Sequence, residues 1–159
     1  MTKTFPTLTW GLFAVALAAG LAADIAWEVW ARYITPLWVG GPLQPATLVQ
    51  QVFGGISYGL AEVIHAFVGI VAYPLGYLYV ARPIADKVTP FLPWQVVGLG
   101  FGVGLWVFAL YVMAHLIAGN PPFLGWVKLT WASLGGHMMF GLIVAYVIRR
   151  FAPRDRMES

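Results

Sequence analysis

The sequence predicts an all-α, multi-pass membrane protein with one domain, residues 1–159, and four transmembrane helices. Three observations predict it. Hydrophobic residues make up 60% of the chain and charged residues only 9%, whereas about a quarter of the residues of soluble proteins are charged. Four apolar stretches are each long enough for the roughly 20 residues with which a helix crosses a bilayer. The basic residues gather on one side of these stretches, as in multi-pass membrane proteins.

The predicted spans follow from the apolar stretches and from the prolines near their ends. Pro93 stands at a favourable position for a helix start, and Pro83 and Pro153 come just after predicted helix ends. Pro74 lies inside the second stretch and predicts a kink. The segment 31–51 is rich in proline and glycine and is expected to be a turn region. The four predicted spans cover residues 8–30, 52–80, 94–118 and 125–148.

The charge distribution predicts the direction of the spans. The connections 31–51 and 119–124 carry only Arg32, whereas the other side is basic. By the positive-inside rule, both termini are expected in the cytoplasm, and the protein in the cytoplasmic (inner) membrane of a bacterium or archaeon. The net charge of +3 is then explained by these anchors and not by nucleic-acid binding. The basic residues of the cytoplasmic side are Lys3, Arg82, Lys87, Arg149, Arg150, Arg154 and Arg156, and the tryptophans of the outer interface are Trp27, Trp30, Trp38 and Trp126.

The sequence also excludes several kinds of site. The chain has no cysteine, which excludes disulfides, thiolate metal sites, iron–sulfur clusters and covalent c-type haem. It contains no Walker loop, dinucleotide fingerprint or nucleophile elbow. The alternating glycines of residues 98–104 lie inside a predicted span, where they favour close helix packing and not phosphate binding.

Two stretches of the sequence are nearly repeated. Residues 65–73 read HAFVGIVAY and residues 137–146 read HMMFGLIVAY, so each has a histidine followed by a glycine four residues later. The second and fourth spans run in the same direction, which places the two histidines at nearly the same depth. Each glycine lies one turn from its histidine on the same face and is expected to leave an open patch beside the imidazole. The pattern predicts a tandem two-helix repeat.

The few polar residues of the spans are expected to share one cavity that opens towards the outside. All of them fall in the middle or outer half of their predicted spans, and ionisable groups within membranes avoid lipid and mark functional interiors. They come in pairs that share a helix face, three or four residues apart. These residues are Asp24 with Glu28, Glu62 with His65, Ser133 with His137, and His115.

Three interpretations of this cavity stay open, beside a pathway for protons or a small solute. In the first, His65 and His137 bond to a carbonyl or carboxylate and stabilise helix packing by about 0.6–2 kcal/mol. In the second, they are the axial ligands of a haem b, and Gly69 and Gly141 admit the macrocycle. The third is a copper or zinc site. Its ligands would be Glu62, His65, His115 and His137.

Residues 53–150 resemble a group of small prokaryotic four-helix integral membrane proteins, a domain of unknown function. The likeness lies in a histidine within the second span, in the glycine-rich run 98–104 and in the stretch 136–142, which reads GHMMFGL. The resemblance implies the four-helix topology and draws attention to His65 and His137, but it implies no activity. The Asp24–Glu28 helix and the long outer connection are not part of it.

The leading functional hypothesis is an accessory or anchor subunit of a larger membrane complex, specifically an electron-transfer complex. A chain of this size without a catalytic domain is expected to have no catalytic activity of its own. Its expected partners are the lipid bilayer and either other membrane subunits or a second copy. The outer segment 33–51, with Trp27, Trp30 and Trp38, is expected to contact that partner. The alternatives are a haem- or metal-binding redox protein that uses His65 and His137, and a small transporter-like protein.

Overall fold

The computed structural model describes residues 6–152, and this range is all-helical. Four helical spans are long and apolar enough to cross a membrane, which confirms the all-α, four-span part of the predicted fold class. The tandem two-helix repeat stays a prediction. They are Trp10–Val39, Tyr58–Val88, Trp94–Ile117 and Lys128–Phe151. The predictions that concern Lys3, Pro153, Arg154 and Arg156 lie outside the described residues.

The first span continues beyond its predicted end. Helix α1 (Trp10–Val29) begins at Thr9, whose hydroxyl accepts a hydrogen bond from the Leu12 N–H. It passes without a break into the π-helical turn η1 (Trp30–Ile34) and the short helix α2 (Pro36–Val39). The Thr35 N–H and hydroxyl both bond to the Trp30 carbonyl at 2.8 and 3.0 Å. These bonds continue the helix where the sequence predicted a turn region.

The turn region also contains a helix. Helix α3 (Pro45–Phe53) is followed by Gly54 and Gly55, which both have positive φ. Glycine tolerates this conformation, so the chain changes direction here. The second span therefore starts at Tyr58, not at residue 52, and Ser57 caps it by accepting from the Leu60 N–H.

The second span alternates between α and π geometry. It consists of α4 (Tyr58–Phe67), η2 (Val68–Ala72), α5 (Tyr73–Gly76), η3 (Tyr77–Ala81) and α6 (Arg82–Val88). Pro74 lacks an N–H donor, and the turn before it widens so that the Tyr73 N–H bonds to the Val68 carbonyl. The sequence predicted that Pro83 follows a helix end, and this is wrong. Pro83 stands in the first turn of α6, where its missing N–H costs little.

The third and fourth spans lie near their predicted positions. Pro93 precedes α7 (Trp94–Val107), as the sequence predicted, and η4 (Phe108–Ile117) completes the third span. The 3-10 segment η5 (Pro122–Trp126) contains four successive residues with positive φ, Phe123 to Trp126. This turn delays the start of α8 (Lys128–Phe151) by three residues relative to the prediction.

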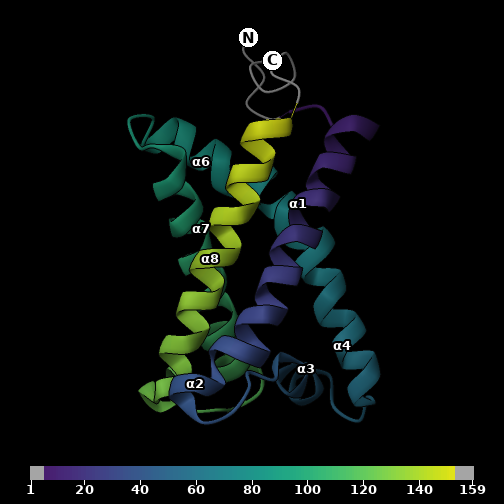
Figure 1. Ribbon diagram of the computed structural model, residues 1–159, viewed down its shortest axis with the longest axis vertical. Helices are drawn as coiled ribbons and strands as arrows, with labels where there is room; N and C mark the ends of the chain where they lie inside the picture. The colour runs from purple at the N-terminus through teal and green to yellow at the C-terminus, as the bar shows by residue number, and fades with distance from the viewer. Residues whose placement is uncertain (1–5, 153–159) are drawn as a thin grey trace.

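Helix α8 is the centre of the bundle. It packs against α7 on one side and α1 on the other, α1 packs against η2, and α3 packs against α4 and η4. Figure 1 shows α8 between α7 and α1, with α4 on the far side of α1. Helices α2 and α3 lie at one end, here called the α2/α3 end, whereas α1 begins and α8 finishes at the other, the terminal end (Figure 1).

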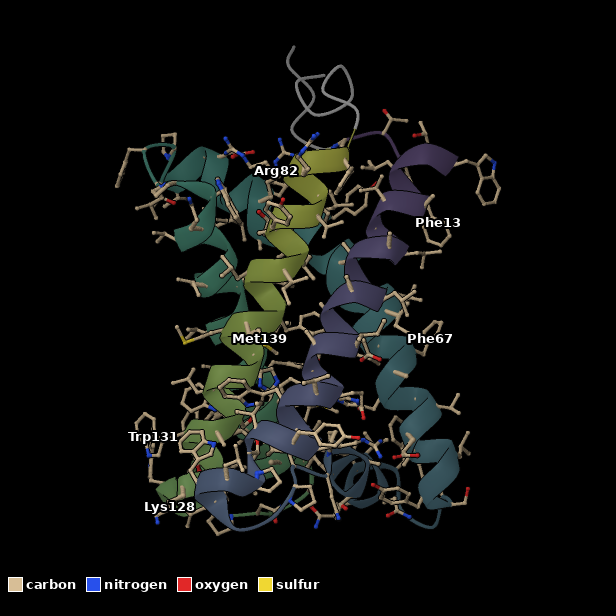
Figure 2. The ribbon with its side chains drawn as sticks, viewed as in Figure 1. Phe13, Phe67, Arg82, Lys128, Trp131 and Met139 are labelled. Carbon is tan, nitrogen blue, oxygen red and sulfur yellow. The ribbon has the colours of Figure 1, made fainter. Side chains whose placement is uncertain are left out.

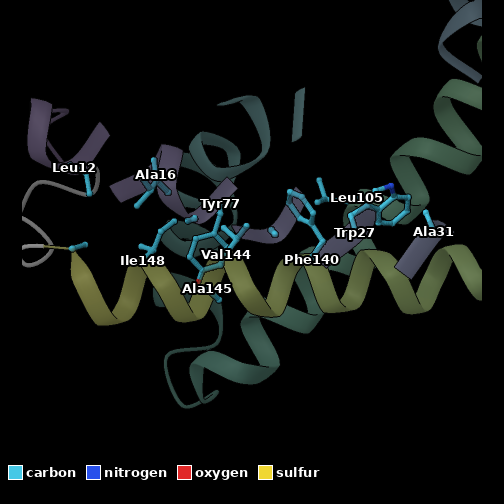
Figure 3. Packing of buried hydrophobic residues seen from close by; sticks show 14 residues of the cluster. Leu12, Ala16, Trp27, Ala31, Tyr77, Leu105, Phe140, Val144, Ala145 and Ile148 are labelled. Carbon is cyan, nitrogen blue, oxygen red and sulfur yellow. The ribbon is translucent and has the colours of Figure 1, made fainter. Parts of the chain in front are cut away.

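Small residues allow the helix backbones to touch. A Cβ on Gly102 would collide with the His137 carbonyl, and one on Gly20 would collide with the Ile70 carbonyl. Gly98 also faces α8, whereas Gly100 and Gly104 have nothing within 4 Å. The predicted role of the glycine run in helix packing is therefore confirmed for alternate glycines. Figure 3 shows the apolar side chains that fill the rest of this core, among them Leu12, Ala16, Val144 and Ile148.

Most basic residues of the described range lie at the terminal end, with one addition to the predicted pattern. Figure 2 shows Arg82 at the terminal end and Lys128 at the α2/α3 end, where the first turn of α8 begins. The α2/α3 end thus carries Lys128 as well as Arg32. Arg82, Lys87, Arg149 and Arg150 belong to the terminal ends of their spans. Which end faces the cytoplasm stays a prediction.

Candidate functional site

A cavity at the α2/α3 end gathers most of the charge of this half of the bundle. Its volume is about 360 Å³. The wall from the first span carries Glu28 and Arg32, and the wall from α4 carries Tyr58, Glu62 and His65. Residues 42–46, from the connection and the start of α3, complete it. Of the residues that were predicted to share one cavity, only Glu28, Glu62 and His65 line it, and α3 helps to close it. Asp24, His115, Ser133 and His137 are not part of its wall.

One arginine joins two glutamates in this cavity. The Arg32 guanidinium donates to Glu28 on its own helix, and its Nη2 donates to Glu62 Oε1 at 3.3 Å. The three side chains are between 38% and 55% exposed, so each ion pair contributes little to stability. Their value lies in position, because Arg32 ties the first span to the second across the cavity. Two carboxylates against one guanidinium leave one net negative charge when His65 is neutral.

His65 is the histidine that lines this cavity. It is half-buried, and its ring nitrogens form no hydrogen bond with another described residue. Its ring centroid lies 6.1 Å from that of Trp27. Its nitrogens are therefore available to a solute in the cavity, as donor or as acceptor.

His137 has a different environment. It is buried, and its Nδ1 donates to the Ser133 carbonyl at 2.7 Å, with the Ser133 hydroxyl at 3.3 Å. A carbonyl can only accept, so Nδ1 carries the proton and a neutral ring has Nε2 as an acceptor. This is the backbone bond expected of a packing histidine, although ligating histidines are oriented in the same way.

Trp27 contacts both histidines. Its ring centroid lies 4.7 Å from that of His137 in an edge-on arrangement, and its indole N–H is buried without a partner among the described residues. Gly135 and Gly136 make room for it and for Trp30, because a Cβ on Gly136 would lie 2.6 Å from the Trp27 ring. The sequence did not predict that Trp27 would join the two histidines. The Gly135-Gly136 pair in the fourth span was the sequence feature that could have indicated a buried tryptophan.

The two glycines of the repeat, Gly69 and Gly141, have different neighbours. Gly69 is buried, and a Cβ there would lie 2.8 Å from Asp24 Oδ1, so the glycine admits a carboxyl group. At Gly141 a Cβ would collide with the backbone of Gly98 and Gly102. The open patch that the sequence predicted beside His137 is therefore filled by α7. Haem binding by His65, His137, Gly69 and Gly141 stays a prediction.

His115 lies apart from the cavity. Its Nδ1 donates to the Asn120 carbonyl at 2.7 Å, and its ring packs against Tyr111. Within residues 6–152, no group of three or more histidine, aspartate or glutamate side chains is arranged to hold a metal ion. The predicted ligand set of Glu62, His65, His115 and His137 is thus not brought together, and only Glu62 and His65 share the cavity.

The three tryptophans that were predicted to contact a partner differ in their exposure. Trp27 is only 5% exposed, and Trp30 donates its indole N–H to the Ala132 carbonyl at 2.9 Å. Both therefore pack inside the chain and are poorly placed for a partner. Trp38 is 46% exposed, and its neighbour Leu37 is 81% exposed. The predicted contact of this segment with a partner stays a prediction.

The resemblance of residues 53–150 to a group of prokaryotic four-helix proteins stays a sequence-based prediction. A scan against protein-family models, a search of curated proteins and a search of solved structures found no match to this chain.

Proposed function

We propose that the chain is a small transporter-like membrane protein that takes up a small cation in the cavity at the α2/α3 end. One observation carries the proposal: Glu28, Arg32, Glu62 and His65 line a single cavity between two membrane spans. The chain has few charged residues, and four ionisable groups within its spans meet there. Ionisable groups at such positions are costly and typically mark solute or ion pathways.

The charge and size of the cavity favour a small cation. The lining has one net negative charge, and Tyr58 adds an aromatic ring that can attract a cation through its face. A volume of about 360 Å³ is at the lower end of small-molecule sites, about 300–1,000 Å³. These features suit a proton or a small ammonium ion better than an anion.

The cavity is closed towards the terminal end. About two turns beyond Glu28 on the first span and one turn beyond Ala66 on the second, the backbone of α1 at Gly20 touches the backbone of η2 at Ile70. The segments η1 and η2 next to the cavity are π-helical, and π turns occur frequently at functional sites. Transport would require the Gly20–Ile70 contact to separate while the cavity closes at the other end.

The subunit hypothesis is a second proposal, and exposed apolar side chains on the first span favour it. Tyr33 is 69% exposed and Leu37 81% exposed, which suits contact with lipid, with another membrane subunit or with a second copy. A polypeptide that co-purifies with the chain would support it, whereas a monomer without companions would count against it. An electron-transfer role additionally requires a Soret band or a metal in the purified protein.

The transporter proposal is tested by comparing two carboxylates that each pair with an arginine. Glu62 lines the cavity, whereas Asp86 bonds to Arg82 at 3.5 Å beside a smaller cavity at the terminal end. Methylammonium binding to the purified protein is measured by calorimetry, and its uptake is measured in proteoliposomes. We expect E62Q to weaken binding at least about tenfold, equivalent to about 1.4 kcal/mol, and D86N to behave like the wild type. Equal binding by E62Q and the wild type, or no uptake by the wild type, would overturn the proposal.

A further inference from the structure

Asp24 is a carboxyl group in the middle of the first span, and it does not line the cavity. It stands one helical turn from Glu28 on the same face of α1, on the side away from the α2/α3 end. Glu28 and Glu62 share Arg32, and Asp86 pairs with Arg82. Asp24 has no hydrogen bond and no ion pair with any residue in the described range.

The second span is shaped to admit this carboxyl group. Gly69 lies one turn from His65 on the same face of its helix, and a Cβ there would lie 2.8 Å from Asp24 Oδ1 and 3.7 Å from its Cγ. Gly69 also belongs to the π-helical segment η2. Immediately beyond Asp24, the Gly20–Ile70 backbone contact closes the passage. Asp24 therefore occupies the last space between the first two spans before the closed region.

The groups that face Asp24 do not balance a negative charge. Its own helix contributes Glu28, one turn away, and α4 contributes His65, one turn from Gly69 on the same face. The rings of His65 and His137 pack against Trp27. Arg32 lies two turns away and is held by both glutamates. The indole N–H of Trp27, three residues along from Asp24, is a second buried polar group without a partner among the described residues. An ionised carboxylate at this depth would be left uncompensated, which is costly within a membrane.

We propose that Asp24 is the proton-binding carboxyl of this protein, and that Gly69 is the residue that admits it. This inference rests on the proposed function, because the proton reaches Asp24 through the same cavity, past His65. Asp24 takes the proton from a hydronium ion that enters by way of the cavity: the carboxyl O–H bond forms as one hydronium O–H bond breaks, and water is left. The proton returns to water by the reverse step. The coupling ion of the transporter is thus the proton, and a cation in the cavity competes with protonation of Asp24 one turn away.

Dicyclohexylcarbodiimide tests this inference without requiring transport. This apolar reagent dissolves in the bilayer and adds to a protonated carboxyl group. The acid proton moves to one carbodiimide nitrogen, and a carboxyl oxygen bonds to the central carbon to give an O-acylisourea. The acyl group then shifts to nitrogen: its bond to that oxygen breaks as the C–N bond forms, and a stable N-acylurea results with no leaving group. The full-length protein is labelled in its membrane, and the adduct is located by peptide mass spectrometry. We expect an adduct at Asp24, its loss in D24N and its retention in E28Q.

Two glycine variants provide the matched control. In G69A the new Cβ displaces the carboxyl group, so most of the adduct should be lost. In G76A, further along the same span, a Cβ meets nothing within 4 Å, and labelling should equal that of the wild type. An adduct that maps to Glu28 or Glu62 in place of Asp24, or G69A labelled as strongly as G76A, would overturn the inference. Methylammonium binding without an Asp24 adduct would refute this inference alone, and the adduct without binding or uptake would refute the transporter proposal alone.

Discussion

His65 and His137 head two stretches of nearly the same sequence, yet the fold uses them differently. His65 is half-buried, lines a cavity and has no hydrogen-bond partner among the described residues. His137 is buried and bonds through Nδ1 to the Ser133 carbonyl. Gly69, four residues after His65, leaves space for a carboxyl group, whereas Gly141, four residues after His137, leaves space for a helix backbone. The local motif is shared, whereas its environment is not.

The difference comes from the position of each helix in the bundle. Helix α8 packs against both α7 and α1, so its His-x-x-x-Gly face is covered by two helices. Helix α4 packs against α3, whereas α1 packs against the next segment of the span, η2, and many side chains of α4 are exposed, such as Phe67 in Figure 2. On a central helix, neighbouring helices fill the space beside the histidine and the glycine. The same pair on a peripheral helix leaves space for polar groups.

The largest effect should come from the glycine of the central helix. In G141A the added Cβ would collide with the α7 backbone at Gly98 and Gly102, and backbone cannot move aside as a flexible side chain can. We expect a loss of about 3 kcal/mol or more of stability, at the upper end of overpacking effects. Thermal unfolding in detergent measures it. G104A, where a Cβ meets nothing within 4 Å, is the control, and an equal melting temperature for the two variants would show that α7 and α8 are not in backbone contact.

Replacing the two histidines by alanine should reduce stability by unequal amounts, both smaller than the loss in G141A. H137A removes a buried ring that packs on Trp27 and bonds to a carbonyl, so we expect a loss of about 1–3 kcal/mol. H65A removes a half-buried ring at a cavity and should change stability by less than about 0.5–1 kcal/mol, while it weakens methylammonium binding. Melting and binding curves of both variants check this. If H65A melted lower than H137A, the contrast between the two sites would be reversed.

The smallest effect should come from S133A. Nδ1 of His137 bonds to the Ser133 carbonyl at 2.7 Å, and the hydroxyl is a longer contact at 3.3 Å. Alanine keeps the carbonyl, so we expect a change within about 0.5 kcal/mol in the free energy of unfolding. The same melting assay measures it. A loss as large as that of H137A would mean that the hydroxyl, and not the carbonyl, orients the ring.

Much of the fold was predictable because membrane spans are encoded locally. Length and apolar character predicted four helices, and Pro93 predicted the start of the third. The errors lie at the ends of helices, where the residues are compatible with more than one backbone geometry. Residues 31–39 look like a turn because of Pro36 and Gly40, yet hydrogen bonds of Thr35 to the Trp30 carbonyl keep them helical. Pro83 looks like a terminator, yet it fits the first turn of α6.

The candidate site was predictable only in part. The sequence identified Glu28, Glu62 and His65 as polar residues of one cavity, and the structure places all three in its wall. It did not identify Arg32 as the residue that joins the two glutamates, because residues 28 and 62 belong to different spans and their distance depends on how those spans pack. Trp27 was assigned to the membrane surface, but Gly135 and Gly136 on α8 admit it to the interior.

The sequence by itself determined that this chain forms four helices long and apolar enough to span a membrane, and that few of their residues are ionisable. Hydrophobicity and helix length are properties of each segment alone. Tertiary structure alone decided which ionisable groups meet. Helix α8 is central because Gly141 lets its backbone touch that of α7 at Gly98 and Gly102. Its Gly135-Gly136 pair also leaves space for Trp27 and Trp30 of the first span. The second span was left at the periphery, with its carboxylate, histidine and glycine facing Asp24, Glu28 and Arg32. Complementary shapes between distant segments set these pairings, and no single segment contains that information.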